Sequence, residues 1–319
     1  SHKSYKAHPA VRLFFALFGA TSFQGSIIEW SIDHRIHHRY TDTEKDPYSI
    51  KEGFWHAHMT WLFTLDESKR DHTLAPDLYA DPIVHWQHKY ITAIMIIMAF
   101  ALPTLIASLW GDPLGGLFIA GGLRLILNLH GTWAINSICH TFGKGHYIEQ
   151  SAKDNWITAL FTFGEGYHNF HHQFPIDFRN GIRWFDYDPT KWLIKFLSSI
   201  RLASHLKKVS KQKILQYKIS YQKSNHNQSL QQVPQYIQTT LQEIYSQLQT
   251  KIKKITLFEN KIALLQKQLQ ASPTNTKLQQ KIKVHKILLR SKWKEMRKGI
   301  NVWKQAIKLN QRILAAQHR

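Results

Sequence analysis

Cysteine is almost absent from this sequence, since Cys139 is the only one in 319 residues. A single thiol excludes a disulfide framework, and it excludes any zinc or iron–sulfur site built from cysteines alone. A metal site in this chain would therefore need other ligands. Histidine is the abundant candidate, because the chain contains 20 of them.

Acidic residues are scarce in the last third of the chain. Residues 201–319 contain 25 Lys and Arg but only 3 Asp and Glu, whereas residues 1–200 contain 17 and 18. The net charge of +21 therefore comes entirely from the last third. The first two-thirds holds 16 of the 20 His and 9 of the 11 Trp. We predict two parts, a domain over residues 1–203 and a Lys- and Gln-rich helical tail over residues 204–319.

Two long stretches carry almost no charge. Residues 90–110 contain no charged side chain and are long enough, at about 1.5 Å per residue, to cross a bilayer. After a Gly-Asp-Pro turn, residues 114–139 form a second apolar stretch, interrupted by Arg124. These stretches predict a transmembrane helical hairpin over about residues 90–139. The alternative is a pair of buried helices in a soluble all-α protein.

A third apolar segment, residues 11–30, is interrupted by Gly19, Gln24 and Gly25. This pattern predicts an interfacial or re-entrant helix. The predicted fold class is an all-α membrane protein with a transmembrane hairpin, a His-rich helical cap and a basic helical tail. The tail leaves the hairpin on the same side as the cap, and the positive-inside tendency makes that side cytosolic.

The tail has its own periodicity. Apolar residues recur at helical spacing and predict a long amphipathic helix that ends at Pro273, followed by a second helix over residues 278–316. The spaced residues are Ile244, Leu248, Ile252, Ile255, Ile262, Leu265 and Leu269. A helical hairpin or coiled coil is the plainest interpretation, and adsorption to anionic membrane lipids is the next. Nucleic-acid binding is disfavoured, because no recognisable motif accompanies the charge.

Two copies of the pattern HxxHH indicate metal chemistry. The triplets are His34, His37 and His38, and His168, His171 and His172. Positions i, i+3 and i+4 share one side of a helix, so each triplet can direct imidazoles to a common point. Neutral imidazole is a common ligand of iron, zinc and copper.

Two further histidines extend this set. His140 ends the second apolar stretch, with Asn136 one helical turn before it, and His2 precedes the interfacial segment. Eight imidazoles are too many for one ion, so two metals are the economical interpretation. A carboxylate di-iron site is disfavoured because only Glu165 and His168 show the Glu-x-x-His spacing. A hydrolytic zinc site, which needs three ligands and an open position, is weaker still.

Longer runs around these motifs carry a family resemblance. Residues 34–48, 164–172 and 186–192 closely resemble the membrane Δ9 fatty acyl-CoA desaturases of the stearoyl-CoA desaturase type, and the similarity covers about residues 1–203. The segment Ser1–Tyr5 resembles the second half of that family's HxxxxH box. The resemblance implies that the first half and two membrane helices lie upstream, so that this N-terminally truncated chain can be inactive alone.

The resemblance implies an acyl-CoA desaturase that inserts a cis double bond, at Δ9, with O2 and two iron ions. An external electron donor such as cytochrome b5 or ferredoxin would be required, because no HPGG haem motif follows residue 200. The enzyme would be an integral membrane protein of the endoplasmic reticulum in a eukaryote, or of the inner membrane in a bacterium. A related fatty acyl hydroxylase and a non-catalytic metal-binding membrane protein are the alternatives.

The resemblance also implies residue roles. One iron would be held by His2, His34, His38 and His171, and the other by His37, His140, His168 and His172, with Asn136 acting through a water. Trp30, Asp33 and Trp133 resemble parts of the acyl-CoA site, but Leu65 and Asp66 stand where animal relatives carry a basic pair. Acids near the clusters could fix the histidine tautomers, the candidates being Asp33, Asp42, Asp46 and Glu165.

Overall fold

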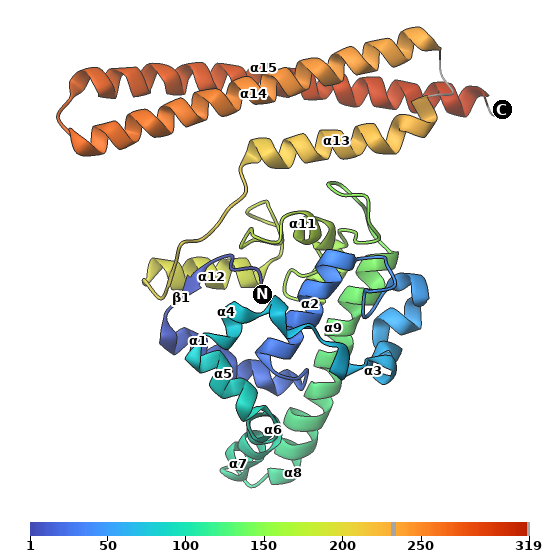
Figure 1. The fold of residues 1–319 in the computed structure, drawn as a ribbon, viewed down its shortest axis with the longest axis vertical. Helices are drawn as coiled ribbons and strands as arrows, with labels where there is room; N and C mark the ends of the chain where they lie inside the picture. Colours follow the sequence, from blue (N-terminus) through green and yellow to red (C-terminus); the bar gives the residue numbers. More distant parts are fainter. Residues whose placement is uncertain (231–233, 318–319) are drawn as a thin grey trace. The chain divides into compact units, whose positions relative to one another are not determined.

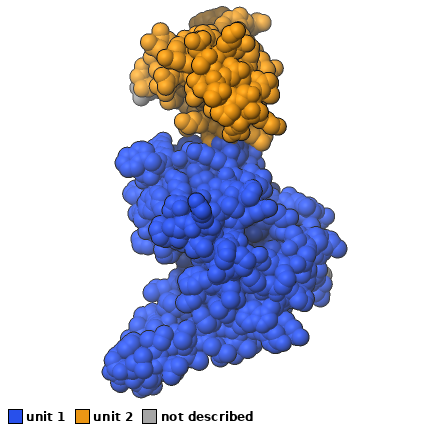
Figure 2. Space-filling model, turned by 90° about the vertical axis from the view of Figure 1, so that its left-hand side faces the viewer, with its two compact units in different colours: residues 1–209 blue, residues 210–319 orange. Residues whose placement is uncertain are grey.

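The computed structural model describes residues 1–230 and 234–317 (Figure 1). The chain divides into two compact units, Ser1–Val209 and Ser210–Arg319, which Figure 2 shows in blue and orange. This division falls a few residues beyond the predicted boundary at residue 203. We call the two parts the histidine unit and the tail unit.

The histidine unit begins with a bent pair of helices. Helix α1 (Pro9–Gly19) and the short turn η1 (Ala20–Ser22) meet α2 (Ile27–Tyr40) at an angle of 76°. Phe23 takes a left-handed conformation (φ 57°) at the bend. Helix α2 starts with a capping box, in which the Ser26 hydroxyl accepts from the Glu29 backbone N–H and the Glu29 carboxylate accepts from that of Ser26. The predicted interfacial segment is therefore a broken helix pair.

Short helices connect this pair to the apolar hairpin. They are η2 (Ile50–Glu52), η3 (His56–Thr60), α3 (Trp61–Thr64), η4 (Glu67–Lys69), η5 (His72–Leu74), α4 (Pro76–Tyr79) and α5 (Pro82–Lys89). Each of α4 and α5 begins with proline, which suits the first helical turn because its missing N–H would have no partner there.

The predicted transmembrane hairpin is confirmed as two helical spans. The first combines α6 (Ile91–Ile96), η6 (Ile97–Ala101) and α7 (Leu102–Ser108), and the second combines α8 (Pro113–Gly115), η7 (Gly116–Leu123) and α9 (Arg124–Thr141). Both are long and apolar enough to cross a membrane. Large apolar side chains stay exposed on them, including Leu105 at 67%. Such an apolar surface is typical of helices that face lipid.

Close packing between the two spans and the hydrogen bonds of one arginine hold this hairpin in place. A Cβ on Gly116 would lie 2.6 Å from the Pro103 carbonyl oxygen, so only glycine permits this approach between the spans. Arg124 does not face lipid alone, because its guanidinium donates to the carbonyl oxygens of Ala120 and Thr21. The apparent obstacle to a span is therefore a link between α9 and the bend after α1.

The remaining elements close the histidine unit. They are α10 (Trp156–Phe161), α11 (His168–Gln173), α12 (Pro189–Ser199) and the antiparallel pair of strands β1 (Lys6–Ala7) and β2 (Ala203–Ser204). Lys191 is buried, and its ammonium group donates to three backbone carbonyl oxygens of the loop that precedes α12. This fully satisfied cation fixes the loop.

The tail unit consists of α13 (Lys211–Leu230), α14 (Gln235–Ala271) and α15 (Thr276–Gln317). Figure 1 shows α14 and α15 running antiparallel, with α13 beside them. Their shared core contains Ile219, Leu241, Leu248, Ile252, Ile255, Met296 and Trp303. The predicted basic helical tail is confirmed, including the break before Pro273, while α13 is an additional helix that the periodicity did not indicate.

Candidate metal centre

Eight histidines of the histidine unit converge in two groups of four. We call His2, His34, His38 and His171 the first tetrad, and His37, His140, His168 and His172 the second tetrad. Within each tetrad, one nitrogen from every imidazole lies within 4.8 Å of the others. All four residues of the second tetrad are buried, whereas His2, His34 and His38 are half-buried.

Each HxxHH triplet is divided between the tetrads. In α2, His34 and His38 join the first tetrad and His37 joins the second. In α11 the division is reversed, because His168 and His172 join the second tetrad and His171 joins the first. Spacing alone allowed each triplet to serve one point, whereas the structure divides each triplet in the way that the family resemblance implies. A pair of helices instead supplies three ligands to each of two points.

The two tetrads are completed from outside these helices. His140, near the end of α9, has its Nε2 atom 3.0 Å from that of His168. His2 precedes β1, and its Nε2 atom lies 2.8 Å from that of His34. The pairing of β1 with β2 holds this N-terminal segment, and the Lys207 N–H donates to the Ser4 carbonyl oxygen two residues from His2.

Neighbouring polar groups fix the orientation of the second tetrad. His37 Nδ1 donates to the Asp46 carboxylate at 2.8 Å, and both side chains are buried. His140 Nδ1 lies 2.6 Å from the Ser151 hydroxyl. With a proton on Nδ1, each of these rings presents its Nε2 lone pair to the interior of the tetrad.

These inward lone pairs suit a cation. The Nε2 atoms of His37, His172 and His168 follow one another at 3.2 and 3.1 Å. When the Nδ1 atoms carry the protons, no donor remains between these acceptors, and unpaired buried acceptors are costly. A metal ion at their centre satisfies all of them. The donor set, with nitrogen ligands only, suits iron, zinc or copper.

The surrounding protein keeps the imidazoles neutral. Burial and the nearby His171 lower the pKa of His2 to about 3. Burial also lowers the pKa of His171 to about 4, and it lowers the pKa values of His168 and His172 well below the ordinary value. Because only neutral imidazole has a free lone pair, these rings are in the form that binds a metal at neutral pH.

Of the four acids considered as partners, Asp46 is the one whose carboxylate contacts a tetrad histidine, while Glu165 contacts His168 through its backbone. Asp42 acts one step away, since it accepts from the Ser151 N–H at 2.8 Å. Glu165 accepts from the Asn180 amide at 2.9 Å, and that amide in turn interacts with His171. Sequence reasoning missed Ser151 and Asn180, because neither belongs to a motif.

The predicted substrate residues and Asn136 differ in their contacts with the tetrads. Trp30 stacks on His34, with ring centroids 4.6 Å apart. The Asp33 carboxylate is buried and accepts three hydrogen bonds from the Arg70 guanidinium, between 2.9 and 3.1 Å. Asn136 is half-buried on α9, one turn before His140, so its role through a water stays a prediction.

Trp133 marks a smaller histidine pair. Its ring lies beside His130, with centroids 5.3 Å apart, and His130 Nδ1 lies 3.1 Å from His58 Nε2. Neither histidine belongs to an HxxHH triplet. With only two imidazoles and a contact from the Ser137 hydroxyl, this pair lacks the four-ligand arrangement of the tetrads.

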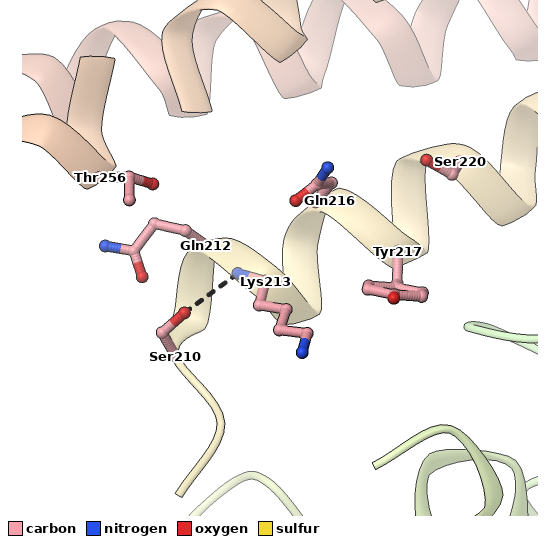
Figure 3. A pocket seen from close by; sticks show the side chains of 7 residues that line it. All are labelled: Ser210, Gln212, Lys213, Gln216, Tyr217, Ser220 and Thr256. Carbon is pink, nitrogen blue, oxygen red and sulfur yellow. Dashed lines mark hydrogen bonds between the residues drawn. The ribbon is translucent and has the colours of Figure 1, made fainter. Parts of the chain in front are cut away.

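A groove in the tail unit offers no comparable chemistry. Figure 3 shows its lining, which comes from the start of α13 and from Thr256 of α14. The side chains are amides, hydroxyls and Lys213. The tetrads therefore remain the candidate reactive site.

Comparison with known proteins places the histidine unit among named relatives. A family model described as fatty acid desaturase matches residues 1–197. The chain is 47% identical over 209 residues to "Probable acyl-CoA desaturase" of Schizosaccharomyces pombe, covering 65% of this chain and 44% of that protein. It is 45% identical over 217 residues to "Acyl-CoA desaturase 1" of Saccharomyces cerevisiae, covering 67% and 42%.

An animal relative matches over a larger share of its length. "Stearoyl-CoA desaturase 5" of Bos taurus is 38% identical over 221 residues, covering 67% of this chain and 66% of that protein. The chain thus spans less than half of the two fungal relatives and about two thirds of the bovine one. The residues that the family model matches, 1–197, lie within the histidine unit.

Proposed function

The chain belongs to the fatty acid desaturase family, and we propose that it acts as an acyl-CoA desaturase. The reaction would insert a cis double bond, at Δ9, into a saturated fatty acyl chain. The observation that carries the proposal is the convergence of eight histidines in two tetrads. The names of the relatives support an acyl-CoA substrate, and one relative from Caenorhabditis elegans is named a Delta(9)-fatty-acid desaturase.

The tetrads would each hold one iron ion, and these two ions would supply the O2-dependent oxidation that removes two hydrogens from the acyl chain. Asp46 and Ser151 would keep His37 and His140 turned toward the metal. Burial of the second tetrad would exclude water from the site. Electrons would come from an external donor such as cytochrome b5 or ferredoxin.

The acyl-CoA contacts are proposed from the same residues. Trp30 would form a wall beside the first tetrad, since it stacks on His34. Asp33 would act mainly by holding Arg70, whose guanidinium donates to it from Nε and Nη2. Trp133 would line the acyl path on α9. The protein would lie in the endoplasmic reticulum membrane of a eukaryote or in the inner membrane of a bacterium. Its catalytic side would face the cytosol.

The test is complementation in a host that lacks its own acyl-CoA desaturase. Cells expressing the full-length protein should regain unsaturated fatty acids with the double bond at carbon 9, located by mass spectrometry. His171→Ala removes a ligand of the first tetrad and should abolish the product. Its matched control is His85→Ala, which removes an imidazole that belongs to neither tetrad.

Metal analysis of the purified protein separates the alternatives. About two irons per chain together with unsaturated product support the desaturase. Hydroxylated fatty acids would favour the related hydroxylase. Bound metal without any oxidised lipid, in a host with a functioning electron donor, would contradict the proposal and favour a non-catalytic metal-binding protein.

A further inference from the structure

One outward surface of the tail unit combines lysines with exposed leucines. We call it the α14 face, and it consists of Lys253, Lys254, Leu257, Lys261 and Leu264. All five residues are exposed, with Leu257 at 68% and Leu264 at 58%. They follow one another at helical spacing and point away from the stripe of buried residues that forms the core of the unit.

The charge of this unit is strongly unbalanced. Residues 210–319 contain 22 Lys and Arg against 3 Asp and Glu. One of these acids, Glu295, is bonded to Lys292 at 2.8 Å, so it is already engaged. The 3 acidic side chains cannot balance the 22 basic ones, so the surface of the unit attracts anionic partners.

We propose that the α14 face docks on anionic phospholipid headgroups of the membrane that holds the two spans. Its lysines would lie at the phosphates, and Leu257 and Leu264 would enter the boundary between headgroups and acyl chains. Helices with a basic rim and exposed large apolar residues bind membranes in this way. A nucleic acid would use the lysines but would leave the exposed leucines unexplained.

The covalent connection supports this choice of partner. The backbone N–H of Val209 donates to the Asp177 carboxylate at 2.9 Å, so the chain is held by the histidine unit up to that point. Helix α13 begins only two residues later, at Lys211. The tail unit is therefore permanently tethered to a membrane-embedded unit, and the tether raises the effective concentration of lipid headgroups around it.

The test uses the whole chain in lipid nanodiscs. A donor dye is attached through Ser272→Cys, an exposed position between α14 and α15, and the natural Cys139 is buried. Acceptor dyes sit on lipid headgroups, in discs of phosphatidylcholine alone or with about a third of phosphatidylglycerol. Energy transfer should be at least about twofold higher in the anionic discs, and the difference should vanish as salt is raised toward about 0.5 M.

Matched variants identify the surface. Changing Lys253, Lys254 and Lys261 to Gln should remove at least about half of the increase that phosphatidylglycerol causes. Changing Lys283, Arg290 and Lys294 to Gln removes the same charge from exposed positions of α15 and should leave most of the increase. A third variant, Leu257→Ser with Leu264→Ser, keeps the charge of the surface. It should also lose part of the increase in energy transfer that phosphatidylglycerol causes. Circular dichroism checks that each variant keeps its helix content.

Three results would overturn the proposal. Equal transfer in the two kinds of disc would exclude recognition of anionic lipid. Equal losses in the two charge variants would mean that net charge acts without the α14 face. Binding of an added RNA oligomer, with no difference between the lipids, would assign the basic surface to nucleic acid.

Discussion

The contact between Asp46 and His37 allows a sharp test of the metal centre. The two side chains are only 1% and 2% exposed, and the carboxylate lies 2.8 Å from Nδ1. The Asp46 carboxylate also accepts hydrogen bonds from the backbone N–H groups of Tyr48 and Asp42, each with an N···O distance of 3.3 Å. Asp46→Asn keeps the shape and one acceptor but removes the charge, whereas Asp46→Ala leaves the His37 N–H without a partner.

The magnitude follows from the role of such partners. Removing a group that orients a ligating histidine lowers metal affinity by about 10- to 100-fold, which corresponds to about 1.4–2.8 kcal/mol. We expect Asp46→Asn near the lower end and Asp46→Ala near the upper end. Because Asp46 contacts only a ligand of the second tetrad, the bound metal should fall from about two ions toward one per chain.

The assay is a chelator competition with metal analysis of the purified protein. Glu44→Gln is the matched control, since it removes a negative charge from an exposed position of the same loop. Wild-type metal content and release rate in Asp46→Ala would refute the assignment of His37 as a ligand. Loss of both ions with unfolding would refute the local role of Asp46, so helix content is measured alongside.

Three further changes test the fold of the two units. Gly166→Ala would place a Cβ against the Ala159 backbone nitrogen, closer than van der Waals contact, and should cost about 2 kcal/mol or more by thermal unfolding, whereas Gly131→Ala meets no atom within 4 Å and should be near neutral. Hydrogen bonding from Arg35 lowers the pKa of Asp77 to about 2, below the unfolded value of about 3.9. Asp77→Asn should therefore destabilise the protein by about 1 kcal/mol at this partly exposed pair. The whole of this difference should be present above about pH 4, and it should disappear as the pH falls through about 2. A difference in melting temperature between wild type and variant that does not change with pH would contradict this prediction. Leu248→Ala removes a fully buried side chain of the tail core and should cost about 2–5 kcal/mol there by denaturant unfolding, while the metal content stays unchanged.

The long helices of the chain could be predicted from the sequence. The hairpin follows from charge-free runs of bilayer length, and the tail helices follow from apolar periodicity and a proline break. Helix α13 escaped this reasoning because Gln, Lys and apolar residues alternate in it without a continuous stripe. The positions of Ser151 and Asn180 could not be predicted either, since they reach their histidines through loops that no motif describes.

Individual contacts also required the structure. The acid at Asp33 suggested a partner for a histidine or for the substrate, yet Arg70 binds it from a loop 37 residues away. Arg124 interrupts the second apolar stretch of the sequence, and only the structure shows that its guanidinium donates a hydrogen bond to the Thr21 carbonyl oxygen. In both cases the sequence shows a costly buried charge but cannot show which distant group satisfies it.

The division of each HxxHH triplet has a geometric cause. On an α-helix, residue i+3 is turned about 60° to one side of residue i and residue i+4 about 40° to the other. His34 and His38 therefore lie close in direction, while His37 points well away from them, and the same holds for His168, His172 and His171. Each helix with this pattern can supply two ligands to one point and one ligand to another. Because α2 and α11 do so in opposite senses, each tetrad receives three ligands from the same helix pair, and His2 and His140 supply the fourth. Six of the eight tetrad histidines therefore come from α2 and α11.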